Sequence, residues 1–328
     1  MLSVAVLSFG LGQEEEPSEM YCQVSRRDGD PQRIFYKTYG DEDAKYKVLL
    51  TMGLGGAHYQ WEPQLEFFKT KEDVIVCVYD NRGIGFSDPV SGRWTTRDMA
   101  QDALELLNHL GWKSGVHIVG LSMGGMITQE LALLEPSRFA SMTLISTIAG
   151  GLASIGLFAI SAPSGIKTLL QTFTTTDPRE QLRHGLKLLY TEEFLDQHSY
   201  NEDKKKHEPN HAIFRRALIK RGVQAKQAGT PDTKMLTLVK QALAVCTHRV
   251  SQEALGALGR HFGQASLVIT GDQDILVHQT NSRILKKALK AKLLTLECAG
   301  HGANEQHAET VNEAIYGNIV NSTKQSKL

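Results

Sequence analysis

The strongest constraint on the fold is an alternation of short apolar segments with helical segments. Val74 to Tyr79 (VIVCVY) is a continuous apolar run rich in β-branched residues, as expected for a strand buried on both faces. Thr95 to Leu110 follows with apolar side chains at helical spacing. Other predicted strands are Ile34 to Tyr39, Lys47 to Met52, Val116 to Val119, Ser141 to Ser146, Ser266 to Thr270 and Leu293 to Glu297, and other predicted helices are Gly124 to Leu134, Asn281 to Leu289 and Asn304 to Val320. This alternation predicts an α/β fold with a parallel sheet.

The alternation is interrupted once. Between about Gly150 and Val250 the sequence becomes helical and irregular, and strands resume only at Ser266. One sheet with a helical insertion is the simplest account. We therefore predict a flexible tail over 1–21, a core formed by 22–149 and 251–320, a helical lid or cap over 150–250, and a tail over 321–328.

Charge and cysteine content narrow the class of protein. The chain has 36 Lys and Arg against 36 Asp and Glu, so no basic excess is present to neutralise a phosphate backbone, and no nucleic-acid partner is expected. The 4 Cys lie far apart, and the His residues show no metal-ligand spacing. We expect neither a metal site nor a disulfide framework.

Gly120 to Gly124 (GLSMG) matches the pattern G-x-S-x-G. Strand residues run directly into it and a predicted helix begins after it, which is the strand-turn-helix setting that this motif needs. The turn would hold Ser122 in a strained conformation and expose its hydroxyl at the carboxyl edge of the sheet. Ser122 is therefore the candidate nucleophile.

A serine hydroxyl needs a base, and the base needs an acid to orient it. The strand Ser266 to Thr270 is followed by Asp272 and Asp274, and the strand Leu293 to Glu297 is followed by His301. All three side chains would leave the same sheet edge as Ser122. The order Ser, Asp, His agrees with the motif, and from spacing alone both aspartates remain candidates for the acid.

Further motifs carry a resemblance to a known family. Asp80 to Ser87 (DNRGIGFS) is similar to a D-x-R-G-x-G-x-S turn, and Met52 to Leu54 (MGL) with Trp61 resembles an oxyanion loop. With the G-x-S-x-G turn, they make the chain from about 34 to 320 resemble an α/β-hydrolase.

The resemblance implies a mostly parallel central sheet flanked by helices, with a helical lid insertion. It also implies Asp274 as the acid, an oxyanion hole made by the backbone N–H groups of Leu54 and Met123, and no cofactor. Met52 stands where the family usually has His, which alters the support of the hole.

The function predicted on this basis is hydrolysis of a carboxylic ester through an acyl-enzyme at Ser122, with the Asp274 and His301 pair as acid and base. The apolar stretch Leu152 to Ile160 would wall the acyl pocket and favours a lipid or a medium to long acyl ester. Thioester and C–C bond hydrolysis use the same groups and stay open. A ligand-sensing receptor or scaffold on this fold is the alternative of another class, and the lid is also a candidate for membrane contact.

Two terminal segments bear on location. Met1 to Gly12 is apolar but lacks the basic residues that open a secretory signal. The chain ends in Ser326, Lys327 and Leu328, the tripeptide that a peroxisomal import receptor reads. We expect the peroxisomal matrix, with the cytoplasm as the alternative.

Overall fold

The structure is a computed structural model of the 328-residue chain. It describes residues 20–24, 32–89, 91–150, 163–175, 177–201, 205–227 and 235–325. The predicted apolar lid stretch Leu152 to Ile160, most of the predicted tail 1–21 and the tripeptide Ser326 to Leu328 lie outside these residues.

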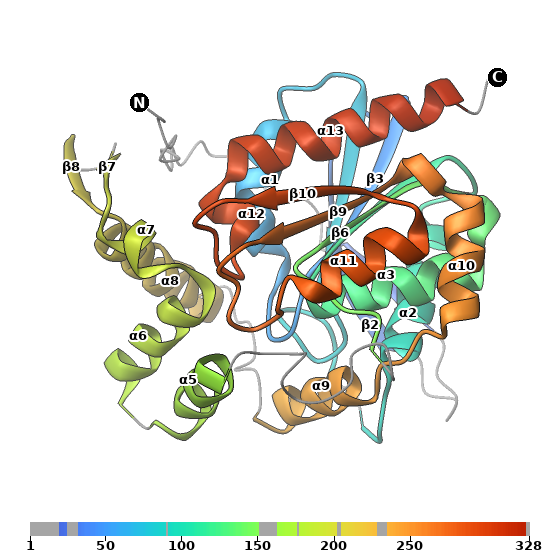
Figure 1. The fold of residues 1–328 in the computed structure, drawn as a ribbon. Helices are drawn as coiled ribbons and strands as arrows, with labels where there is room; N and C mark the ends of the chain where they lie inside the picture. Colours follow the sequence, from blue (N-terminus) through green and yellow to red (C-terminus); the bar gives the residue numbers. More distant parts are fainter. Residues whose placement is uncertain are drawn as a thin grey trace.

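Eight strands form one sheet in the order β1-β2-β4-β3-β5-β6-β9-β10 (Figure 1). The six strands from β4 to β10 in this order are parallel; β2 pairs antiparallel with β4, and β1 pairs antiparallel with β2. Their bounds are β1 Tyr21–Val24, β2 Gln32–Tyr39, β3 Tyr46–Thr51, β4 Val74–Tyr79, β5 Val116–Leu121, β6 Phe139–Ile145, β9 Ser266–Gly271 and β10 Lys292–Leu296. The predicted α/β class and mostly parallel sheet are confirmed.

Helices cover both faces of the sheet (Figure 1). On one face lie α1 Glu62–Phe68 and α13 Ala308–Gln325, with the short α12 Ala303–Gln306 before α13. On the other lie α2 Thr96–His109, α3 Met123–Leu134, α10 Gln252–His261 and α11 Thr280–Leu289. Three 3₁₀ turns, His58–Trp61, Pro136–Arg138 and Gly263–Ala265, precede elements of the core.

The continuous apolar strands are explained by these two layers. In β4 the side chains of Val74, Val76 and Val78 join the hydrophobic cluster under α1 and α13, while Ile75 and Cys77 join the cluster under α2 and α3. Successive strand side chains point to opposite faces, so a strand covered on both sides must be apolar throughout. Each fully buried Val contributes about 1.5–3 kcal/mol relative to an exposed one.

The insertion runs between β6 and α10. It contains α5 Pro163–Thr174, α6 Pro178–Leu189, α7 Glu192–Asp196, β7 His198–Asn201, β8 Lys206–Pro209, α8 Asn210–Gln227 and α9 Met235–Thr247. An antiparallel bridge between Gly150 and Arg249 joins its two ends. At the same junction Nδ1 of His248 lies 2.8 Å from the Thr96 hydroxyl, and burial lowers the pKa of His248 to about 4, so the imidazole is neutral.

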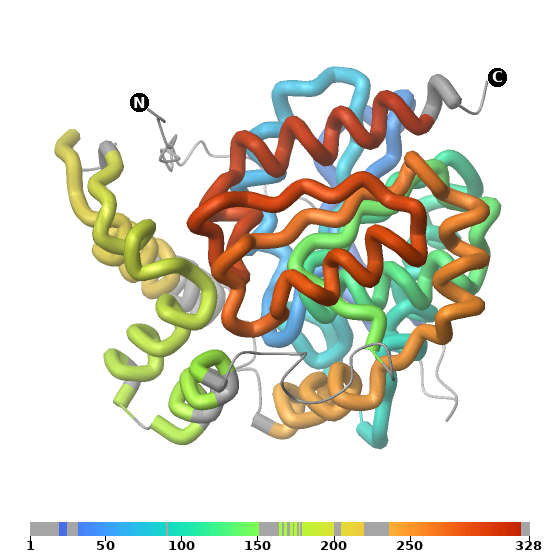
Figure 2. The backbone as a smooth tube through the Cα atoms, in the orientation of Figure 1, coloured from blue at the N-terminus to red at the C-terminus, as the bar shows by residue number. Residues whose placement is uncertain are grey.

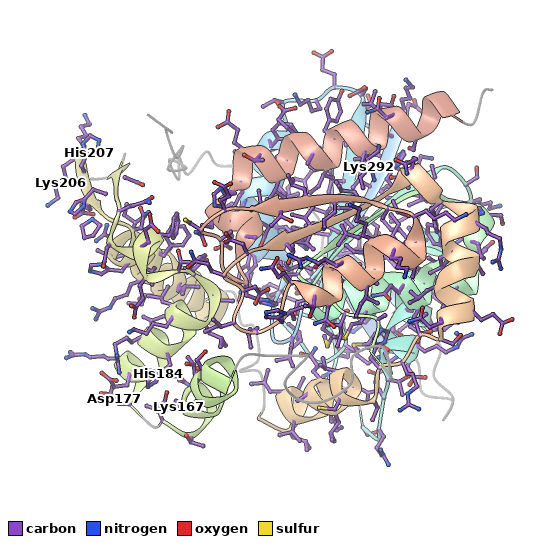
Figure 3. All side chains as sticks on the ribbon, in the orientation of Figure 1. Lys167, Asp177, His184, Lys206, His207 and Lys292 are labelled. Atoms are coloured by element: carbon purple, nitrogen blue, oxygen red, sulfur yellow. The ribbon has the colours of Figure 1, made fainter. Side chains whose placement is uncertain are left out.

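Most of the insertion projects to one side of the sheet. Helices α5 to α8 and the hairpin β7-β8 lie together in Figure 2, whereas α9 lies separately beneath the core. The first group has a small core of its own, in which Phe214 contacts the rings of Tyr190 and Phe194. Figure 3 shows Lys206 and His207 on β8 at the outer side of this group, away from the sheet.

Three features differ from the sequence prediction. Strand β1 begins at Tyr21, and the hairpin β7-β8 interrupts a segment expected to be helical. Helix α13 continues beyond Val320 to Gln325, through residues expected to form a tail, and the Ser322 hydroxyl donates to the Ile319 carbonyl at 2.8 Å. A polar composition alone does not end a helix, because the backbone hydrogen bonds from each N–H to the carbonyl four residues earlier can continue through polar residues.

None of the helices in the described ranges is long and apolar enough to cross a membrane.

Candidate active site

Ser122 occupies a sharp turn between β5 and α3. Its backbone has φ 56° and ψ −121°, in the left-handed range that non-glycine residues rarely adopt. A Cβ on Gly120 would lie 2.3 Å from the Gly124 carbonyl oxygen, and one on Gly124 would lie 2.1 Å from the Thr51 carbonyl oxygen. Only hydrogen fits at these two positions, so both glycines of the motif are required by backbone packing.

The turn is held by the neighbouring strand. The Ser122 N–H donates to the Ile145 carbonyl at 2.8 Å, and the Thr147 hydroxyl donates to the Ser122 carbonyl at 2.6 Å. Helix α3 begins at Met123, so its N-terminal N–H groups and the positive end of its dipole lie beside the serine. This is a favourable place for negative charge that develops on a substrate oxygen.

His301 and Asp274 form a buried pair. Nδ1 of His301 lies 2.8 Å from Oδ2 of Asp274, and the two side chains are 7% and 0% exposed. The N–H groups of Leu276 and Val277 each donate to Oδ1 of Asp274 at 2.8 Å. Because an ionised carboxylate only accepts, the pair favours the tautomer with a proton on Nδ1 and leaves Nε2 of His301 as the basic nitrogen.

Asp272, the other candidate acid, has a different role. Its Oδ1 accepts the N–H of Ala299 at 3.3 Å, and its own N–H donates to the Leu296 carbonyl at 3.0 Å. Asp272 therefore ties the turn after β9 to the turn after β10. The structure brings Asp274, and not Asp272, into contact with the imidazole.

The loop that carries His301 is fixed by Gln306. The side chain of Gln306 accepts from the Gly300 N–H at 3.1 Å and donates to the Cys298 carbonyl. The Gly302 N–H donates to the Leu189 carbonyl, in the insertion, at 2.7 Å. The loop that carries His301 is thus held both by the core and by the insertion.

The predicted oxyanion loop lies against the serine turn. A Cβ on Gly53 would lie 3.1 Å from Cβ of Ser122 and 3.7 Å from the Met123 nitrogen, so the chain from Gly53 to Leu54 passes directly beside Ser122. The Asn81 amide donates to the Met52 carbonyl at 2.9 Å. This bond supports the loop at the position where the resemblance leads one to expect a histidine.

The insertion contacts each of the three loops of the site, which the sequence did not reveal. Gly165 at the start of α5 packs against the Ile275 carbonyl, beside Asp274. The Leu189 carbonyl accepts the N–H of Gly302, in the loop that carries His301, at 2.7 Å. Helix α9 meets the oxyanion loop, where Gln241 Oε1 accepts the Gly55 N–H at 2.7 Å. No sequence signal identifies these contacts, because each joins residues more than 100 positions apart.

The D-x-R-G-x-G-x-S turn is structural. Arg82 makes two 2.7 Å bonds to the buried carboxylate of Asp102, and the Ser87 hydroxyl donates to the Asp80 carbonyl at 2.6 Å. The Asp80 carboxylate in turn accepts the backbone N–H of His58 and contacts its ring nitrogen at 2.9 Å. These side chains hold the turn beside the oxyanion loop.

Three other features of the described residues do not compete with the site. A hydrogen bond from Cys298 to Glu193 and the charge of that carboxylate raise the pKa of the thiol, which keeps it protonated. Among the described residues no His, Cys, Asp or Glu cluster suits a metal ion. A hollow of about 530 Å³ is bounded by Gly40, Phe68 and Val74, but Val74 begins β4, so it lies at the opposite end of that strand from the site.

Comparison with known proteins places this architecture in a family. Residues 46–308 match the family described as the alpha/beta hydrolase fold. A protein named carbamate hydrolase RutD from Azorhizobium caulinodans is 34% identical over 113 residues, which are 34% of this chain and 40% of that protein. The chain thus spans about two fifths of that relative. The protein of the same name from Pseudomonas syringae pv. syringae is 29% identical over 259 residues, 78% of this chain and 87% of that protein.

Solved structures agree at the level of the fold. A thermophilic esterase from Thermogutta terrifontis superposes with a TM-score of 0.68 at 19% identity, over 93% of this chain and 99% of that chain. Its strand order, its serine turn and the match over residues 46–308 show that the chain belongs to the α/β-hydrolase fold family.

Proposed function

We propose that this chain is a serine hydrolase that cleaves a carboxylic ester through an acyl-enzyme at Ser122. One observation carries the proposal: Asp274 holds His301 at 2.8 Å on the same sheet edge at which the strained turn presents Ser122. A strained turn and a buried carboxylate-imidazole pair each cost free energy. A catalytic role explains why both are present at the same sheet edge.

The proposed reaction uses only side chains and backbone of this chain. The Ser122 oxygen attacks the acyl carbon while Nε2 of His301 takes its proton, and Asp274 stabilises the imidazolium. The N–H groups of Leu54 and Met123 stabilise the oxyanion, and His301 then protonates the leaving alcohol. Water, activated by His301, attacks the acyl-enzyme and releases the acid.

We propose that the insertion is the lid of the acyl pocket and that a lipid or a medium to long acyl ester is the substrate. The contacts of the insertion with the three site loops support the lid role. Thioester and C–C bond hydrolysis begin with attack by the same oxygen. The relatives are named for carbamate hydrolysis, which makes a carbamate a further candidate substrate. Its carbonyl carbon is open to attack by the same serine oxygen.

A fluorophosphonate probe tests the nucleophile. We expect covalent labelling that maps by mass spectrometry to Ser122, followed by sustained turnover of esters in excess over enzyme. Labelling with only a single turnover would favour the ligand-sensing receptor instead. A matched panel of ester, thioester and carbamate with the same acyl group would then rank the bond types by kcat/KM.

The acyl pocket predicts a dependence on chain length. Each additional CH₂ that the pocket buries contributes up to about 0.8 kcal/mol, or about fourfold in kcat/KM, until the pocket is filled. We expect kcat/KM for p-nitrophenyl esters to rise from acetate to an optimum at a longer chain. The rate measured with the Ser122→Ala variant is subtracted as background hydrolysis. A maximum at the acetyl ester would contradict an apolar acyl pocket.

We propose a peroxisomal location from the tripeptide Ser326 to Leu328, read by the import receptor. A fluorescent protein fused to the amino terminus should give puncta that coincide with a peroxisomal marker. Deletion of the three residues should disperse the signal into the cytosol. A diffuse signal from the intact fusion would favour the cytoplasm.

A further inference from the structure

Gln241 is a fully buried amide at the junction between the insertion and the oxyanion loop. It lies on α9, is 0% exposed, and its Oε1 accepts the Gly55 N–H at 2.7 Å. The residues around it on α9 also pack on this side of the core. Leu238 lies 3.2 Å from where a Gly55 Cβ would stand, and Thr237 lies 3.0 Å from the corresponding point at Gly83.

The bond to Gly55 acts close to the reacting atoms. Gly55 follows Leu54 directly and is two residues from Gly53, whose backbone packs on Ser122. Two residues of chain span at most about 7 Å, so the Gln241 bond fixes the loop within about 7 Å of the point where it packs on Ser122. A loop with two glycines at positions 55 and 56 has many accessible backbone conformations, and this bond selects one of them.

The other end of the same amide is unsatisfied. Nε2 of Gln241 is buried and has no hydrogen-bond partner among the described residues. The amide is planar, so the bond that Oε1 accepts also fixes the direction of the two N–H groups. A buried donor without an acceptor is unfavourable, and at a binding site a ligand oxygen can satisfy it.

We propose that Gln241 is a positioning and specificity residue of the active site. Its oxygen holds the loop that carries the Leu54 N–H, and its N–H₂ donates to a second acceptor oxygen of the substrate, beyond the scissile carbonyl. The inference rests on the proposed serine-hydrolase function. It also adds a substrate class, namely acyl compounds with an additional keto, carboxylate or ester oxygen near the reacting bond.

Substitutions separate the two ends of the amide. Gln241→Glu keeps an oxygen that accepts from Gly55 but removes the N–H₂ donors, and Gln241→Met removes both at similar volume. The matched control is Gln181→Met, which makes the same change at an exposed glutamine of α6 whose amide donates to the Thr172 carbonyl. Thermal unfolding shows whether each variant is folded. If the Met variant fails to fold, Gln241→Asn is used instead, because it keeps an amide on a side chain shorter by one CH₂.

Two p-nitrophenyl esters of equal length provide the readout, one with a plain alkyl chain and one with a keto oxygen in that chain. On the plain ester we expect Gln241→Met to lower kcat about 10- to 100-fold with KM within about twofold, because a misplaced oxyanion loop affects the transition state. Gln241→Glu should lower kcat on this ester less than Gln241→Met does, because it keeps the oxygen that accepts from Gly55. The wild-type protein should prefer the keto ester by about tenfold in kcat/KM, and both variants should lose that preference.

Wild-type kcat in Gln241→Met on the plain ester would overturn the positioning role. A keto preference that persists in both variants, or is absent from the wild-type protein, would overturn the donor role. Fluorophosphonate labelling of Ser122 distinguishes these failures from failure of the proposed function. If Ser122 reacts and turns over while the Gln241 variants match Gln181→Met, only the present inference is wrong.

Discussion

Replacing Ser122 by alanine is expected to lower kcat on any ester substrate by on the order of 10⁴ or more and to abolish fluorophosphonate labelling. The proposed reaction begins with a bond from the serine oxygen to the acyl carbon, and no other nucleophile stands at this turn. The loss should appear in kcat and kcat/KM alike in steady-state kinetics. Turnover equal to that of the wild-type protein would refute the assignment.

Ser146 is a matched control for this substitution. It also has a positive φ, 47°, it is fully buried, and it follows β6, the strand next to β5. Its hydroxyl has no hydrogen-bond partner among the described residues. Ser146→Ala makes the same chemical change in a similar backbone setting, so kcat should stay within a few-fold of wild type. A comparable loss in both variants would indicate a structural effect at the sheet edge.

Replacing Asp274 by asparagine is expected to lower kcat by on the order of 10³ to 10⁴. The oxygen facing Leu276 and Val277 can still accept their N–H groups, so the turn should fold. The amide N–H₂ would then face Nδ1 of His301, which favours the wrong tautomer and removes the charge that stabilises the imidazolium. The measurement is kcat across pH, with thermal unfolding as the check on folding.

Asp272→Asn gives the comparison. Asp272 contacts the Ala299 N–H rather than the imidazole, and an asparagine oxygen can still accept that bond at 3.3 Å. We expect a loss of less than about tenfold. A larger loss at Asp272 than at Asp274 would reverse the assignment of the acid.

Much of the fold was predictable because its signals are local. The apolar run Val74 to Tyr79 is strand β4 with the predicted bounds, since a strand covered on both faces cannot contain polar residues. The helix expected over Thr95 to Leu110 forms Thr96–His109, where Thr95 and Asp98 make a reciprocal capping box. Where the signal was weaker, as in the hairpin β7-β8, the prediction was wrong because short strands in a polar segment have no distinctive period.

The candidate site was likewise predictable from the sequence only in part. The sequence by itself determined where Ser122 and His301 stand, because a glycine-flanked turn after a strand and the common carboxyl edge of parallel strands follow from chain order and backbone sterics. The resemblance already favoured Asp274 over Asp272 as the acid, but only the tertiary structure showed which of them contacts the imidazole, since this depends on two side-chain directions within one turn. The tertiary structure also decided that Gln241 and Leu189 reach the site, because such contacts arise when an insertion packs on loops more than 100 residues away.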